Sequence, residues 1–139
     1  MGTELDIAFP PPVGVPYRWS LDYTPRAIGV ARRQVRETLE ARRVPSATVE
    51  VIELLTSEVV TNAIVHAHSA PCVEMFVSDQ AVRISVEDHS AEPPRLRHVT
   101  PTALTGRGMS LVDRLSALWG TRFVAGGGKK VWFEVPFAY

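Results

Sequence analysis

The stretch LTSEVVTNAIVHAHS, residues 54–68, predicts a helix whose polar residues lie in an unusual place. Glu58, Asn62 and His66 are spaced so that, at 100° per residue, they fall within about 80° of one another. Apolar residues of the same helix occupy the same sector, namely Val51, Leu55 and Val59. A carboxylate and an amide that face a core cost several kcal/mol unless they are paired or a cavity receives them. The stripe therefore indicates either a satisfied polar network or a cavity for a charged ligand.

The rest of this helix fits an ordinary amphipathic pattern. The residues predicted to face solvent are Glu50, Glu53, Ser57 and Thr61. His66 by itself is interpreted as a structural histidine near a helix end. If the stripe lines a ligand cavity, Asn62 offers a neutral oxygen for a hard cation such as Mg²⁺. Glu58, one turn earlier on the same face, could then accept a proton from a nucleophile.

Composition and charge exclude several classes of protein. The chain has 139 residues, 45% hydrophobic and 22% charged, which predicts one globular domain. Its 15 basic and 15 acidic residues balance, so we do not expect direct nucleic-acid binding. Cys72 is the single cysteine, which excludes a disulfide framework and a cysteine-based zinc site. No apolar run approaches the roughly 20 residues of a membrane span, and the acidic, proline-rich N-terminus is no secretory signal. We therefore expect no membrane association and a cytoplasmic location.

The order of predicted elements favours an α+β fold. Residues 1–16 are interpreted as a flexible, proline-rich arm, and residues 17–139 as one domain. Thr24 resembles a helix N-cap, with Pro25 at the first helical position. Helices are expected over 25–43, over 46–67 and from about Gly108 to before Trp119. Strands are expected over 17–23, 72–78, 82–88, 119–124 and 130–136, the last two joined by the glycine turn in AGGGK. This order predicts a two-layer sandwich with helices on one face of a mixed sheet.

A cluster of arginines lies on the first predicted helix and just beyond it. Glu37 and Glu40 interrupt the cluster, which predicts a solvated face, with a partner-binding face as the alternative. The arginines are Arg26, Arg32, Arg33, Arg36, Arg42 and Arg43.

Two further segments carry possible ligand groups. In AVRISVED, the alternation of Val82, Ile84 and Val86 predicts that Asp88 also points inward at the strand end, although an aspartate closing a strand is common. In TGRGMSLV, glycines at the start of a helix allow backbone N–H groups to approach an anion. Between these segments, residues 89–105 lack periodicity, and a loop of that length in a compact domain is typical of a functional lid or a disordered segment.

These three segments, in this order, resemble the Bergerat-fold (GHKL) ATP-binding family. Among its members, the anti-sigma factor serine kinases of the sporulation and stress-response type are the most similar. The resemblance covers roughly residues 17–136 and implies a two-layer α/β sandwich of the Bergerat type. It implies that Asn62 binds Mg²⁺, that Glu58 is the catalytic base and that Asp88 accepts a hydrogen bond from the adenine amino group. It also implies ATP contacts from Gly106, Arg107 and Gly108, and an ATP lid over 89–105.

The resemblance also implies an activity and partners. The chain is expected to be a protein serine/threonine kinase and anti-sigma factor that uses Mg²⁺ and ATP. It would phosphorylate a STAS-type anti-anti-sigma protein and sequester a sigma factor, and the resemblance also implies a homodimer. The alternatives are a partner-binding module in which nucleotide is structural or absent, and an ATPase without a protein partner.

Overall fold

A six-stranded mixed sheet forms one layer of the protein. The computed structural model describes residues 3–5, 16–90, 112 and 114–139. Within them the strands lie in the order β1-β5-β6-β4-β3-β2; β1 pairs with β5 in parallel, and the other neighbouring pairs are antiparallel. The strands are β1 (Thr3–Leu5), β2 (Tyr17–Ser20), β3 (Cys72–Val77), β4 (Ala81–Asp88), β5 (Leu118–Phe123) and β6 (Lys129–Pro136).

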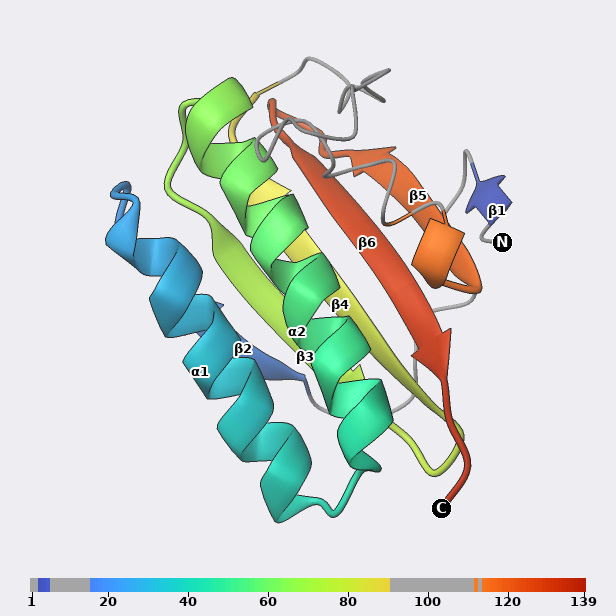
Figure 1. Cartoon of the computed structure of the whole chain (residues 1–139). Coiled ribbons are helices and arrows are strands. Elements are labelled where there is room, and N and C mark those ends of the chain that lie inside the picture. The colour runs from blue at the N-terminus through green and yellow to red at the C-terminus, as the bar shows by residue number, and fades with distance from the viewer. Residues whose placement is uncertain (1–2, 6–15, 91–111, 113) are drawn as a thin grey trace.

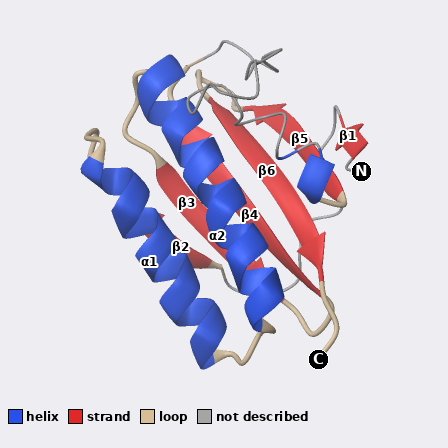
Figure 2. Cartoon of the chain, viewed as in Figure 1, coloured by secondary structure: helices blue, strands red, loops and turns tan. Residues whose placement is uncertain are grey.

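Two helices form the second layer, on one face of the sheet (Figures 1 and 2). They are α1 (Arg26–Ala41) and α2 (Ser46–Thr61), and α2 continues into a π-helical turn, η1 (Asn62–His66). The predicted α+β class, with helices on one face of a mixed sheet, is thereby confirmed. No helix among the described residues is long and apolar enough to cross a bilayer.

The core lies between α2 and the central strands because the strands alternate with period two. Ile84 of β4 and Phe133 of β6 are register partners, and both are completely buried. Leu55 and Val59 supply the facing side of α2. Burial of these side chains contributes roughly 1.5–3 kcal/mol each. This packing fixes the end of α2 relative to the ends of β4 and β6, where the candidate site lies.

Most predicted elements are confirmed, with shifts at their ends. The strand predicted over 17–23 ends at Ser20, although the Leu21 N–H still donates to the Pro71 carbonyl at 2.9 Å. No strand was predicted from the sequence at Thr3–Leu5, which pairs with β5. The helix predicted near Gly108 lies mostly outside the described residues, which include helical residues 112, 114 and 115.

The predicted cap of the first helix is wrong. Pro25, rather than Thr24, is the N-cap, and no side chain caps this helix. The first turn is instead closed by backbone bonds of the i→i+3 type, from Ala27 to the Thr24 carbonyl at 3.0 Å and from Ile28 to the Pro25 carbonyl at 3.2 Å. These bonds satisfy the N–H groups of Ala27 and Ile28, which would otherwise need a side-chain cap as acceptor.

The predicted solvent face of α2 is wrong at Glu53. This side chain is only 8% exposed because α1 lies alongside α2. Arg36 donates to Glu53 Oε2 through Nη2 at 2.6 Å and through Nε at 3.0 Å, and Arg32 lies 3.7 Å from Oε1. The hydrogen bond to Glu53 raises the pKa of Arg36 above its ordinary value. A helical wheel of α2 alone cannot detect arginines contributed by α1.

Candidate functional site

Asn62 lies at the junction between α2 and the π-helical turn. Its backbone N–H points to the carbonyls of Glu58 and Val59, and its own carbonyl accepts from Ala67 N at 3.1 Å. The side chain is 7% exposed and makes no hydrogen bond with any residue that the structure describes. The amide keeps some contact with solvent, since among the described residues it is not one of the fully buried polar groups without a partner. π turns occur frequently at functional sites. Asn62 therefore has the position and the free bonding capacity of a ligand-binding residue.

Glu58 and His66 lie at the edge of the same stripe. Both are half-buried, and both have interaction partners within the protein. The prediction that the stripe faces inward is confirmed for Asn62, whereas its two neighbours along the stripe are intermediate. A carboxylate at such a border can keep access to a ligand while remaining held by the protein.

Asp88 ends β4 on the face that lies against the helices. Its side chain is 2% exposed, and Val82, Ile84 and Val86 are buried in the same phase of the strand, as predicted. The backbone N–H of Ser90 donates to Asp88 Oδ1 at 2.8 Å, which closes a short turn after the strand. The inward orientation predicted from the alternation is therefore confirmed.

A hydrogen bond holds the ends of the helix and the strand together. The His89 N–H donates to Ser69 Oγ at 2.9 Å, and Ser69 is itself buried. The Ser69 N–H in turn donates to the Ala63 carbonyl, within the π-helical turn, at 3.2 Å. This connection places the turn that begins at Asn62 next to the strand that ends at Asp88. No pattern in the sequence predicts this role for Ser69.

Lys129 is a second residue of this region that was missed from the sequence. It is the register partner of Asp88, and its Nζ donates to Asp88 Oδ1 at 3.0 Å. Both side chains are 2% exposed, so the ion pair is buried. Lys129 is in phase with Val131, Phe133 and Val135. The same alternation predicts that its side chain points inward once the strand is extended by one residue, from 130 to 129.

Gly128 allows β6 to approach Asp88 closely. Its φ is +92°, and a Cβ built at this position would lie 2.5 Å from the Asp88 carbonyl oxygen. Any side chain at Gly128 would therefore displace the strand end that carries Asp88.

The remaining predicted site residues lie outside the described part of the chain. These are Gly106, Arg107 and Gly108, together with the predicted lid from residue 91 onward. Within the described residues, no group of three or more histidine, cysteine, aspartate and glutamate side chains could hold a metal ion.

The comparisons with known proteins agree with the fold. Residues 21–134 match the model of the histidine kinase-like ATPase domain, which covers most of the chain. The chain belongs to this family. A crystal structure of the RsbU and RsbW domains of Rv1364c from Mycobacterium tuberculosis has the same fold, with a TM-score of 0.67 at 23% identity. That match covers 88% of this chain and 32% of the other, so this chain spans about a third of that protein's length. A search of curated proteins gave no match.

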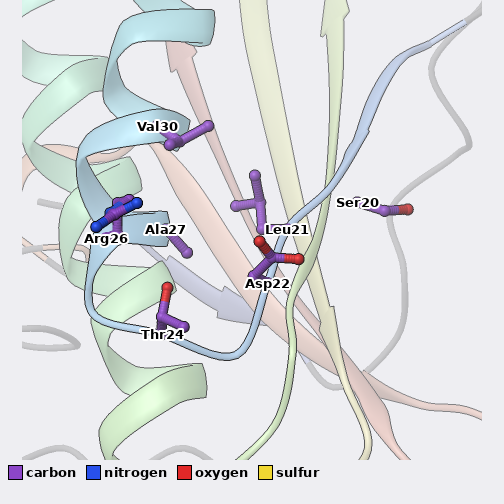
Figure 3. Close-up of a pocket in the computed structure, with 7 residues that line it drawn as sticks. All are labelled: Ser20, Leu21, Asp22, Thr24, Arg26, Ala27 and Val30. Carbon is purple, nitrogen blue, oxygen red and sulfur yellow. The ribbon is translucent and has the colours of Figure 1, made fainter.

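A small cavity of this histidine kinase-like ATPase domain is lined by none of the predicted site residues. It has a volume of about 120 Å³ and is formed where the chain leaves β2 and enters α1 (Figure 3). The lining residues are Ser20, Leu21, Asp22, Thr24, Arg26, Ala27 and Val30. Ligand pockets usually measure roughly 300–1,000 Å³, so this cavity is too small for a nucleotide.

Proposed function

We propose that this domain binds Mg²⁺-ATP between the end of α2 and the ends of β4 and β6, and that it is a protein serine kinase. Two observations support nucleotide binding at this edge. The Asn62 amide makes no hydrogen bond with the described part of the protein. Within that part, both hydrogen bonds that the Asp88 carboxylate accepts use Oδ1, which leaves Oδ2 for a ligand. In a member of the histidine kinase-like ATPase family, the residues present therefore fit a purine nucleotide with a bound cation.

The proposed roles follow from the chemistry of each side chain. Asn62 holds the cation through its amide oxygen, the type of ligand that Mg²⁺ prefers. Asp88 Oδ2 accepts a hydrogen bond from the adenine amino group. Gly106, Arg107 and Gly108 contact the phosphates, where backbone N–H groups favour an anion. When bound, Mg²⁺ neutralises the charge of the phosphate oxygens.

Glu58 is the proposed general base. A serine hydroxyl of the partner forms a bond to the γ-phosphorus while the bond from that phosphorus to the β–γ bridging oxygen breaks, and ADP leaves. Glu58 accepts the proton that the serine oxygen loses, which is typically worth 10²–10⁴-fold in rate. Most of the remaining catalysis is positioning, as in other phosphoryl transfers.

The proposed partners are a STAS-type anti-anti-sigma protein, which carries the serine, and a sigma factor, which the domain sequesters when unphosphorylated partner is scarce. A homodimer is part of the same proposal. The sequence resemblance to anti-sigma factor serine kinases supports these partners.

Co-purification from the native cell, with partners identified by mass, followed by phosphotransfer from ATP labelled at the γ position, tests this function. We expect label on one serine of a captured anti-anti-sigma protein, and none when that serine is replaced by alanine. A captured partner that gains no label while ATP is bound would contradict the kinase and leave a nucleotide-binding, non-catalytic anti-sigma module.

A further inference from the structure

The buried ion pair between Lys129 and Asp88 has more bonding capacity than the protein uses. Moving a charged group out of water costs several kcal/mol even after relaxation, and fully buried lysines are rare unless they are paired. Here both members are 2% exposed, and they lie at the same edge of the sheet as the turn that begins at Asn62. The donors and acceptors that this pair leaves unused decide whether it can also bind a ligand.

The Asp88 carboxylate is used on one side only. Oδ1 accepts both from Lys129 Nζ at 3.0 Å and from Ser90 N at 2.8 Å. Within the described part of the chain, Oδ2 accepts no hydrogen bond. A carboxylate oxygen has capacity for further donors, so Oδ2 is available to a donor on a ligand.

The Lys129 ammonium also has N–H donors that the described protein does not use. It carries three N–H donors, and its bond to Asp88 is the one hydrogen bond it makes to residues that the structure describes. The two remaining N–H groups lie within a few ångströms of Oδ2, because both groups belong to one ion pair. A ligand that presents a donor next to an acceptor would satisfy both groups at once.

We propose that Lys129 recognises the nucleobase directly, by donating a hydrogen bond to a purine ring nitrogen next to the amino group that Asp88 Oδ2 binds. This proposal rests on the nucleotide binding proposed above. In adenine the 6-amino group is a donor, and the ring nitrogens on either side of it, N1 and N7, are acceptors. Guanine in the same pose would place its O6 acceptor against the carboxylate. The pair would therefore contribute both affinity and selectivity for adenine.

The competing interpretation is that Lys129 only compensates the charge of Asp88. The two interpretations differ in one respect: only a direct contact makes binding sensitive to the ring nitrogen itself. Wild-type protein can therefore decide between them, without a substitution that perturbs the buried pair.

The experiment is isothermal titration of the wild-type chain with Mg²⁺ and ATP, 1-deaza-ATP or 7-deaza-ATP, in which a C–H replaces N1 or N7. A hydrogen bond to a charged donor predicts that one analogue binds about 10- to 100-fold more weakly than ATP, while the other binds within about threefold. Equal binding of ATP and both analogues would overturn the proposed role of Lys129 but not the proposed nucleotide binding. A similar loss with both analogues would also overturn it, and no binding of ATP would overturn the proposed function as well.

Two variants locate the effect on Lys129. In Lys129→Met, the difference between ATP and the sensitive analogue should disappear, provided that the variant melts cooperatively. Lys130→Met is the matched control, because Lys130 is the next residue of β6, points to the other face and pairs with Glu74 at 3.2 Å. It should keep the wild-type difference. A difference that persists unchanged in folded Lys129→Met would overturn the proposal, and the wild-type titrations remain decisive if that variant does not fold.

Discussion

At the scale of single residues, the Asn62 side chain contributes little to the fold from its position in the helix. Asparagine within a helix costs about 0.5 kcal/mol relative to alanine. Its side chain is buried, and it makes no compensating hydrogen bond with the described residues. Natural sequences break local rules of this kind mainly at functional sites.

Replacing Asn62 by alanine should therefore not destabilise the protein in the absence of nucleotide. We expect a free energy of unfolding equal to wild type or higher by up to about 0.5 kcal/mol, because alanine restores helix propensity and removes a buried amide. Urea unfolding without nucleotide measures it. Leu55→Ala is the control for core loss on the same helix and should lose about 2–5 kcal/mol. A loss of more than about 1 kcal/mol in Asn62→Ala would show instead that the amide is a structural group.

Glu58→Gln separates catalysis from binding. Glutamine keeps the size and the hydrogen bonding of the side chain but cannot take a proton, so single-turnover phosphotransfer should fall by about 10²–10⁴-fold. The ATP affinity and the melting temperature should change little, because Asn62 and Asp88 remain. Glu50→Gln, an exposed position on the same helix, should transfer phosphate at the wild-type rate. A folded Glu58→Gln protein that also does so would remove Glu58 from the mechanism.

At the scale of elements, the candidate site depends on the register between β4 and β6. Gly126 and Gly128 lie in the same hairpin with nearly the same φ, +93° and +92°. A Cβ at Gly126 would meet nothing within 4 Å, whereas one at Gly128 would lie 2.5 Å from the Asp88 carbonyl oxygen. The two glycines therefore share a backbone requirement and differ in how closely the neighbouring strand approaches.

Gly128→Ala should consequently be more destabilising than Gly126→Ala. Both variants suffer the strain of a positive φ, and the clash at Gly128 should add roughly 1–3 kcal/mol of overpacking. Gly128→Ala should also weaken ATP binding, because the strand end that carries Asp88 must move. Thermal unfolding and titration of the two variants measure both effects. Equal stability of the two would contradict the close approach of β6 to Asp88.

The elements also show which features of the fold and the candidate site can be predicted from the sequence. Period-two alternation was enough to place Asp88 inward, and helical period was enough to place Asn62 on an apolar face. Lys129 was missed because the glycine run hides where β6 begins. The burial of Glu53 was missed because it depends on Arg36 of another helix. The π-helical turn at Asn62, which contacts β4, has no signal in local propensity.

At the scale of the whole molecule, the proposed site needs two layers at once. The sheet supplies Asp88 and Lys129, the helical layer supplies Asn62 and Glu58, and Ser69 connects the two through His89. Neither layer alone contains both the proposed cation ligand and the proposed base-recognition pair. The central claim is therefore that one nucleotide joins groups from both layers.

Isothermal titration of Mg²⁺-ATP into wild type and Asn62→Ala tests that claim most directly. We expect saturable wild-type binding that is millimolar or tighter. Asn62→Ala, though folded, should bind at least about tenfold more weakly, because one charge-assisted contact is lost. Wild-type protein without measurable ATP binding, or folded Asn62→Ala that binds ATP as tightly as wild type, would contradict the assignment of the site.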